Sequence, residues 1–523
     1  MAIQILKNRL FKISAIAIAI IYSMIHILQI SAKKYIVNFL DKKIPAHIHL
    51  VYDKIEVNLI TGSLLITDIT LDMSNKNTGV EHTEMHMEDI SMEGFGYFNY
   101  FFGNTIGANK IKLLNPKVRF YNDNSSNKIA PDKPLDAGTE KVFILDHLEI
   151  VDGEIVNIQK ETNTIKFTVE KLNLSVEDLK TDRSLFKSKI PLTYGKYFLS
   201  TGRLFLDIDP FEILTIKGAK VEGSELQLTN LNLKTKYDRK ELSKRLTKEH
   251  DHLDLTVEEV KLSDIDFGYN SERFFFKTGS MMVQQPSLAI YRDKLVADDM
   301  VPKKLYSQKL REMPIDLDIA KINIKNGDIS YAELVNEGTL PGELVFSDLE
   351  ASLNNISNTY EKAEETQIEA SAKLMGNAQI QLQWNFDTSK ENDAFYVSGV
   401  VKDFKSESLN QFLQSNLRAK AEGDINELYF TISGDAISSS GDMKMKYQDF
   451  RFMVLKKDRL GVNKFLTFLG NMITNDGSKT DAMGFRHGEI YAERDVTKSF
   501  FNYLWLNVMD GIVSTLTGDG KKE

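Results

Sequence analysis

The sequence predicts a mainly β protein that begins with a transmembrane helix, continues as a long antiparallel sheet with a few short helices, and ends in an amphipathic helix. Three observations lead to this prediction. An almost entirely apolar stretch lies near the N-terminus, apolar and charged residues alternate through most of the body, and apolar residues recur every three or four positions near the C-terminus. A period of two is typical of strands with one wet face, and the longer period is typical of a helix.

The N-terminal stretch "ISAIAIAIIYSMIHILQI" covers residues 13–30. As a helix it would extend about 27 Å, close to the thickness of a bilayer core, so we expect a transmembrane anchor. Residues 1–12 would then form a short cytoplasmic N-terminus, and residues 31–53 a polar bridge. A cleaved signal peptide is the alternative because basic residues precede the stretch, but the stretch is long for a signal and no clear cleavage site follows.

Two glycine-centred segments suggest strand hairpins. In "LDHLEIVDGEIVNIQK" apolar residues alternate on both sides of Asp152-Gly153, and "IAKINIKNGDISYAEL" does the same around Asn326-Gly327. Asp-Gly and Asn-Gly favour the positive φ of a tight turn. Each segment is therefore interpreted as two paired strands with one apolar and one wet side.

The segments around these glycines indicate an internal repeat. The residues Pro116, Val118, Phe120 and Tyr121 match Pro286, Leu288, Ile290 and Tyr291 at an offset of 170, and the two glycines are 174 apart. We take residues 109–180 and 279–357 as related units of a repeat array. The alternative is convergence, because any antiparallel sheet produces alternation.

The rest of the chain divides by pattern. Residues 54–365 are expected to form the repetitive β region, residues 366–460 a C-terminal β block and residues 461–523 a helical segment. Basic segments at 234–250 and 292–313, and "SLNQFLQSNL", suggest short helices or loops. The aromatic run "GFGYFNYFFG" is interpreted as a buried or edge segment of the sheet, with an interfacial membrane patch as the alternative.

The C-terminal segment "KSFFNYLWLNVMDGIVSTLTGDGKKE" has the spacing of an amphipathic helix. It could dock on the sheet or lie on a membrane. In the second case, Phe501, Leu504, Trp505 and Val508 are the candidate membrane-contact residues.

Composition excludes several kinds of function. The net charge of −9 argues against a nucleic-acid partner, and the absence of cysteine excludes disulfides, thiolate metal sites and a thiol nucleophile. No phosphate-binding loop or Gly-x-Ser-x-Gly elbow occurs, so we expect neither an enzyme nor a cofactor. His82 and His86 are four residues apart, a spacing that would put both imidazoles on one face of a helix. Their segment has the alternation of a strand or loop instead, so no metal site is predicted there.

The C-terminal β block carries a family resemblance. In "EGDINELYFTISGDAISSSGDMKMKYQDF", Gly423, Gly434, Gly441, Tyr447 and Phe450 stand where glycine-punctuated strands occur in the AsmA family. Together with the N-terminal span and the serial strands, this segment resembles that family of bacterial envelope proteins, which are related to TamB.

The resemblance implies an elongated, curled antiparallel sheet that forms a repeating β-groove with an apolar concave face. It also implies a single-pass inner-membrane protein with its body in the periplasm, which binds phospholipid and supports its transfer toward the outer membrane. Its partners would be phospholipid and the inner membrane, with the outer membrane or envelope proteins as further candidates. The alternative function is a non-catalytic scaffold or regulator of outer-membrane protein assembly.

The candidate groove-lining residues are those on the alternating apolar side next to the two glycines. They are Val118, Phe120, Ile155, Leu288, Ile290, Ile329 and Tyr331. The alternative is that these side chains form an ordinary packed core.

Overall fold

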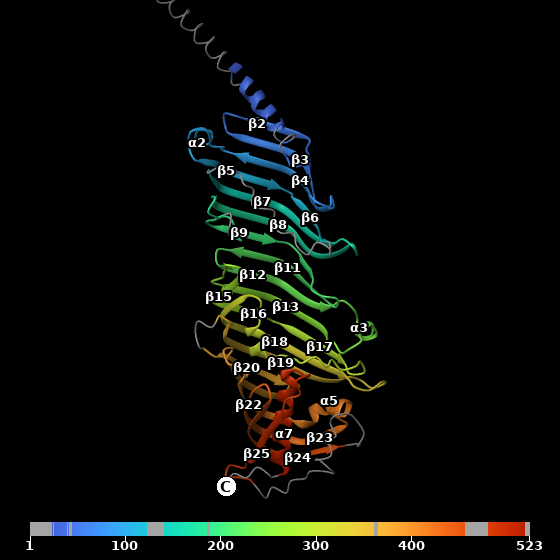
Figure 1. The fold of residues 1–523 in the computed structure, drawn as a ribbon. Helices are drawn as coiled ribbons and strands as arrows, with labels where there is room; N and C mark the ends of the chain where they lie inside the picture. The colour runs from blue at the N-terminus through green and yellow to red at the C-terminus, as the bar shows by residue number, and fades with distance from the viewer. Residues whose placement is uncertain are drawn as a thin grey trace, which may run out of the picture. The chain divides into compact units, whose positions relative to one another are not determined.

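A computed structural model describes residues 23–24, 26–38, 40, 44–122, 141–185, 189–359, 364–454 and 480–517. The chain forms two compact units, with the division inside one strand: unit 1 comprises residues 1–207 and 217–223, and unit 2 comprises residues 208–216 and 224–523. Both units are built mainly from strands that follow one another in chain order, so the predicted mainly β, repeating architecture is confirmed (Figure 1).

Unit 1 is a ladder of long strands and split strands. Two short strands, β1 and β2, pair side by side with β3, which pairs with β4. The split pairs β5/β6 and β9/β10 occupy equivalent places further along the ladder. The elements are β1 (Ile48–Val51), β2 (Lys54–Asn58), β3 (Ser63–Ser74), β4 (Glu81–Glu93), α2 (Tyr97–Phe102), β5 (Thr105–Leu114), β6 (Lys117–Asn122), β7 (Val142–Gln159), β8 (Thr164–Thr181), β9 (Tyr197–Thr201) and β10 (Leu204–Asp207).

The division between the units falls in β11 (Glu212–Glu222), and unit 2 continues the same pattern. Its strands are β12 (Glu225–Thr235), β13 (His252–Ser263), β14 (Asp266–Asn270), β15 (Arg273–Thr278), β16 (Ser280–Gln284), β17 (Ser287–Asp293), β18 (Asp316–Leu334), β19 (Gly342–Ser357), β20 (Thr366–Leu374), β21 (Ala378–Phe386), β22 (Phe395–Lys405), β23 (Ala419–Gly434), β24 (Ser438–Val454) and β25 (Arg486–Glu493).

Helices lie where the sequence suggested them in unit 2. Short helices α3 (Arg239–Arg245) and α4 (Tyr306–Arg311) fall in the two basic segments, and a helical stretch of η2 (Ser406–Leu409), α5 (Asn410–Phe412) and η3 (Leu413–Leu417) covers "SLNQFLQSNL". The C-terminal helix α7 (Phe500–Thr517) packs on the face of β23, β24 and β25 (Figure 1).

The predicted repeat is visible in the backbone hydrogen bonds. The N–H of Asn115 donates to Val151 O at 2.8 Å, and the N–H of Gln285 donates to Lys325 O at the same distance. Pro116 O and Pro286 O likewise accept bonds from the residues after the two glycines. In both copies a split strand pair therefore docks on one long strand at the same point.

The predicted hairpins at the two glycines are wrong. Strands β7 and β18 each run straight through Asp152-Gly153 and Asn326-Gly327, with register shifts at those positions. Asp152 has φ +54° and Asn326 has φ +53°. The sequence signal for positive φ was correct, but here it marks a β-bulge, which inserts one extra residue without reversing the chain.

The bulges change which residues share a face. Side chains alternate strictly along a regular strand, so Ile150 and Ile155 would point to opposite faces. The bulge between them brings both to one face, and the same shift separates Ile324 from Ile329. Residues with positive φ also lie inside four other strands: Asp68 in β3, Lys171 in β8, Asn230 in β12 and Asp348 in β19. Such residues therefore recur along each unit's ladder, although β4 and β13 have none.

The sheet is not purely antiparallel as predicted. Strands β5 and β6 both run parallel to β7, and β15, β16 and β17 run parallel to β18. Parallel strands need a crossover connection rather than a tight turn. The connection from β6 to β7 includes residues 123–140, which lie outside the described residues.

The predicted single-pass inner-membrane location is also corrected. Among the described residues, no helix is both long enough and apolar enough to cross a membrane. The transmembrane helix expected at residues 13–30, and the placement of the body that followed from it, are therefore not supported. Residues 13–22 and Ile25 of that stretch lie outside the described residues.

Candidate functional site

One face of unit 1, which we call the apolar face, carries apolar side chains in continuous rows across its strands. In each row, every residue lies directly opposite the next on the neighbouring strand. A row near one end of the strands contains Ile66, Ile90, Leu113, Ile150, Leu174 and Leu199. A row beyond the bulges contains Leu71, Met85, Val118, Ile155, Val169 and Leu204. The bulges join the two rows on one face.

The structure places the candidate lining residues of unit 1 together on this face. Val118 and Ile155 are direct cross-strand partners. Phe120 lies in the next row, between Thr83 and Asn157, and keeps 40 % of its surface exposed. The three residues therefore form a contiguous patch that solvent reaches at one side.

The other four candidates occupy the equivalent face of unit 2. Leu288 is the partner of Ile329, and Ile290 is the partner of Tyr331. The hydroxyl of Tyr331 donates a hydrogen bond to Glu333, and burial raises the pKa of this tyrosine. The two patches are equivalent in sequence and in pairing, because both sit where a split strand pair docks on a long strand.

The opposite face of unit 1 is polar. Lys110 lies 2.5 Å from Glu149, which is two residues beyond its direct partner His147 on the adjacent strand β7, and Arg119 lies 3.9 Å from Glu84. Such exposed pairs contribute little to stability, with a typical value of about 0–1 kcal/mol each. Their main consequence is that this face is solvated. The apolar face is therefore the one that a second layer or a ligand would have to bury.

No second layer covers the apolar face in the described part of unit 1. The strands pack on their neighbours in the sheet and the short helix α2 packs beside β5, while the two clusters of buried apolar residues both lie in unit 2. An antiparallel sheet with one apolar face normally buries it against helices or another sheet. Unit 1 therefore presents an apolar surface with no second layer among the described residues, and part of that surface is already buried, since Ile69 and Met87 are each 2 % exposed and Val169 is 7 % exposed.

The C-terminal block shows the same kind of face when it is covered. Here α7 packs on the apolar rows of β23, β24 and β25, and Ile432 is completely buried (Figure 1). Gly511 of the helix lies so close to Met443 and Ile490 that an added Cβ would stand 2.7 Å from the Met443 side chain. Trp384 stacks on Phe500 with ring centroids 4.4 Å apart. This end of the sheet has a conventional core.

The candidate membrane-contact residues of α7 divide by position. Leu504, Trp505 and Val508 pack against the core beneath the helix, and the Trp505 ring lies 6.3 Å from that of Phe412. Phe501 points away from the core and is 57 % exposed. The helix therefore docks on the sheet, which was one of the two positions expected for it.

The aromatic run near the N-terminus is not a buried or edge segment of the sheet, as first interpreted. It forms α2, which has no buried residue, and Phe98, Phe101 and Phe102 are 75 %, 68 % and 80 % exposed. The ring of Phe95 holds the base of the helix through contacts with Tyr97 and Tyr100. Three phenylalanines thus project from the side of unit 1.

Groups suited to catalysis or metal binding do not gather at either apolar face. Within the described ranges, no three His, Asp or Glu side chains are arranged to hold a metal ion. His82 and His86 lie on β4, as the alternation predicted. His250 Nε2 lies 2.8 Å from Glu212 Oε1, and burial raises the pKa of that glutamate, although the histidine opposes the effect.

No family model matches this chain, and no curated protein sequence matches it. The resemblance to the AsmA family thus stands on the quoted sequence features alone.

Sequence reasoning missed most of the apolar face. Ile69, Leu71, Met85 and Met87 complete its rows in β3 and β4 but were not among the candidates. The detectable signal was a break in alternation: Ile66 and Ile69 are three residues apart, as are Met87 and Ile90. A search for such breaks would have found each bulge and assigned the residues on both sides to one face.

Proposed function

We propose that the apolar face of unit 1 binds the acyl chains of phospholipid in an open groove and supports lipid movement across successive strands. The observation that carries this proposal is the set of continuous apolar rows with no covering layer among the described residues. Burial of apolar surface contributes about 25 cal/mol per Å², so an uncovered face of this kind favours an apolar occupant.

Acyl chains suit this face because they need only apolar contact. The rows cross the strands at a spacing of about 4.8 Å, and similar side chains recur at each step. A methylene that leaves one strand meets an equivalent surface on the next, so the free energy changes little along the path. Movement of this kind requires no catalytic group.

The experiment is to purify the full chain and measure bound phospholipid by mass spectrometry, in the wild type and in two neighbouring variants. Leu174 lies in one of the two apolar rows, opposite Ile150 and Leu199, and Ser175 lies on the polar face opposite Glu149. Leu174→Lys puts a charge among acyl chains, whereas Ser175→Lys puts it beside a carboxylate.

We expect Leu174→Lys to lose at least about half of the bound phospholipid, because an unpaired charge on an apolar surface is costly. Ser175→Lys should retain it. Both variants would first be shown to be folded by circular dichroism. A lipid-free wild type, or equal retention by both folded variants, would refute lipid binding at this face and leave the scaffold for outer-membrane protein assembly as the working function.

A further inference from the structure

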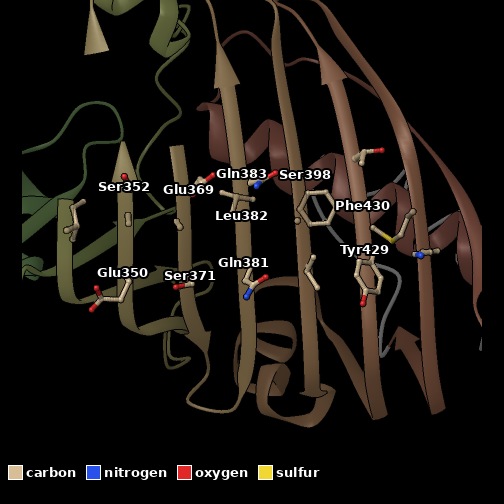
Figure 2. Close-up of a pocket in the computed structure, with 18 of the residues that line it drawn as sticks. Glu350, Ser352, Glu369, Ser371, Gln381, Leu382, Gln383, Ser398, Tyr429 and Phe430 are labelled. Atoms are coloured by element: carbon tan, nitrogen blue, oxygen red, sulfur yellow. Dashed lines mark hydrogen bonds between the residues drawn. The ribbon is translucent and has the colours of Figure 1, made fainter. Parts of the chain in front are cut away.

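Unit 2 has a hollow on the face of the sheet opposite α7. It has a volume of about 960 Å³ and crosses every strand from β18 to β25. Figure 2 shows side chains from successive strands around it. We call it the polar trough, for the side chains described next.

The register shows which face the trough occupies. Its floor is the row Ala351, Ala370, Leu382, Gly399, Phe430 and Met443, and its walls are the rows on either side. One wall includes Glu369, Gln383 and Ser398, and the other includes Ser371, Gln381 and Tyr429. Because neighbouring residues of a strand point to opposite faces, both walls project away from the face on which α7 packs.

The central strands of the trough, β20 to β23, are rich in neutral hydrogen-bonding groups. These are Ser371, Gln381, Gln383, Ser398 and Thr431, and one carboxylate, Glu369, lies among them directly opposite Gln383. The charged lining residues are Lys325 and Lys444 against Glu350, Glu369 and Asp442, so two positive and three negative charges give −1 with His487 neutral. This balance disfavours a polyanion.

Several of these side chains have hydrogen-bonding capacity to spare. Within the described chain, Gln381 and Ser371 form no side-chain hydrogen bond, and Ser398 reaches Gln383 only at 3.4 Å. A glutamine amide offers two donors and an acceptor with two lone pairs. Amides and hydroxyls on adjacent strands match the vicinal hydroxyl groups of a sugar, which also donate and accept.

An aromatic ring stands beside the amides. The Tyr429 ring is held in place by its hydroxyl, which donates to Glu427 at 2.6 Å, and by the Lys444 ammonium, 4.7 Å from the ring centroid. A fixed tyrosine combines an apolar surface with a polar tip. Pyranose rings have the complementary character, with C–H groups on one side and hydroxyls around the edge.

The length of the trough favours a chain over a single ring. Eight strands at about 4.8 Å each extend over roughly 34 Å between the first and the last. We propose that the polar trough binds a linear, uncharged oligosaccharide, with Gln381 and Gln383 at its centre. This site lies in unit 2 on the solvated face, so it is independent of lipid binding by unit 1.

The test is calorimetric titration of the full chain with cellohexaose and the fully N-acetylated chitin hexasaccharide. At least one should bind, and a Gln381→Ala/Gln383→Ala variant should weaken that binding about tenfold or more, since two amide contacts to hydroxyls are lost. Gln379 is the matched control: it lies on the same face of β21, two residues beyond Gln381, and outside the trough. Gln379→Ala should change affinity by less than about twofold.

Three results would overturn the proposal. The first is that neither hexasaccharide binds at millimolar concentration. The second is that Gln379→Ala weakens binding as much as the Gln381→Ala/Gln383→Ala variant. The third is that a heparin-derived hexasaccharide binds more tightly than both neutral probes. Circular dichroism of each variant separates loss of the site from loss of the fold.

Discussion

At the scale of single residues, burial in unit 2 depends on which face of a strand a side chain occupies. Val397 and Val400 lie on one strand, β22, but Val397 points into the core beneath α7 and is fully buried, whereas Val400 lines the polar trough. Two valines of the same strand therefore lie in different environments, one in the core and one at the trough.

We expect Val397→Ala to lower the free energy of unfolding by about 1.5–3 kcal/mol, because it removes apolar contacts and leaves a cavity. Val400→Ala should cost less than about 1 kcal/mol. Urea unfolding followed by tryptophan fluorescence measures both. Both tryptophans of the chain, Trp384 and Trp505, pack in the C-terminal core, so the signal reports on this region. Equal losses would contradict the assignment of faces.

At the bulges, the backbone conformation of a single residue determines which substitutions the fold tolerates. Asn326 has φ +53°, a conformation that glycine adopts freely and that β-branched residues strongly resist. We expect Asn326→Gly to change the free energy of unfolding by less than about 0.5 kcal/mol, and Asn326→Val to lower it by about 1–2 kcal/mol. Urea unfolding of each variant measures both. Similar stability of the two would show that the bulge relaxes.

At the scale of elements, the segment before α7 is attached to the loop after β17 by charges. Lys498 Nζ lies 2.9 Å from Asp298 and 3.6 Å from Glu249, and the Lys303 N–H donates to Val496 O at 2.7 Å. A hydrogen bond from Lys498 lowers the pKa of Asp298, and hydrogen bonds from Lys303 and Lys248 lower that of Asp299.

A lowered folded-state pKa stabilises the fold above the unfolded value, about 3.9, and that contribution is lost as pH falls through the folded pKa. We therefore expect the melting temperature, followed by tryptophan fluorescence, to fall more steeply between about pH 5 and pH 2 in the wild type than in the Asp298→Asn/Asp299→Asn variant. Parallel curves for the two proteins would show that these carboxylates do not hold the segment.

Helix α2 is the opposite kind of element, because its apolar residues are not packed. Replacing Phe98, Phe101 and Phe102 together by Ser should change the free energy of unfolding by less than about 1 kcal/mol, since all three are well exposed. We also expect less flotation with phosphatidylcholine vesicles, because aromatic side chains favour the membrane interface. Replacing the exposed Ile437 by Ser is the control, and unchanged flotation of the triple variant would exclude a vesicle contact through α2.

The sequence predicted element types better than connections. Alternation located the strands, and apolar spacing located α7, because both follow from local geometry. The parallel pairing of β5 and β6 with β7 could not be predicted, since it depends on a crossover between distant residues. Asp152-Gly153 was misread as a turn because positive φ occurs in bulges and turns alike.

At the scale of the whole molecule, the candidate sites depend on rows of residues rather than on a local constellation. The apolar face needs Ile66, Met85 and Ile155 from strands far apart in the sequence, and the polar trough needs eight strands in register. Val118 and Ile155 could be proposed from alternation beside a glycine. Gln381 and Gln383 could not, because a polar residue on a strand has no distinguishing signal until a hollow surrounds it.

The bulges have a consequence for how such a chain finds its fold. Strands with a plain two-residue alternation can slip past each other by two positions and still keep apolar side chains together, and a chain with many similar strands offers many such errors. A slipped pair in this protein would set a bulge against a regular stretch and turn part of one strand to the wrong face. The extra residue in a bulged strand therefore favours one alignment with the neighbouring strand.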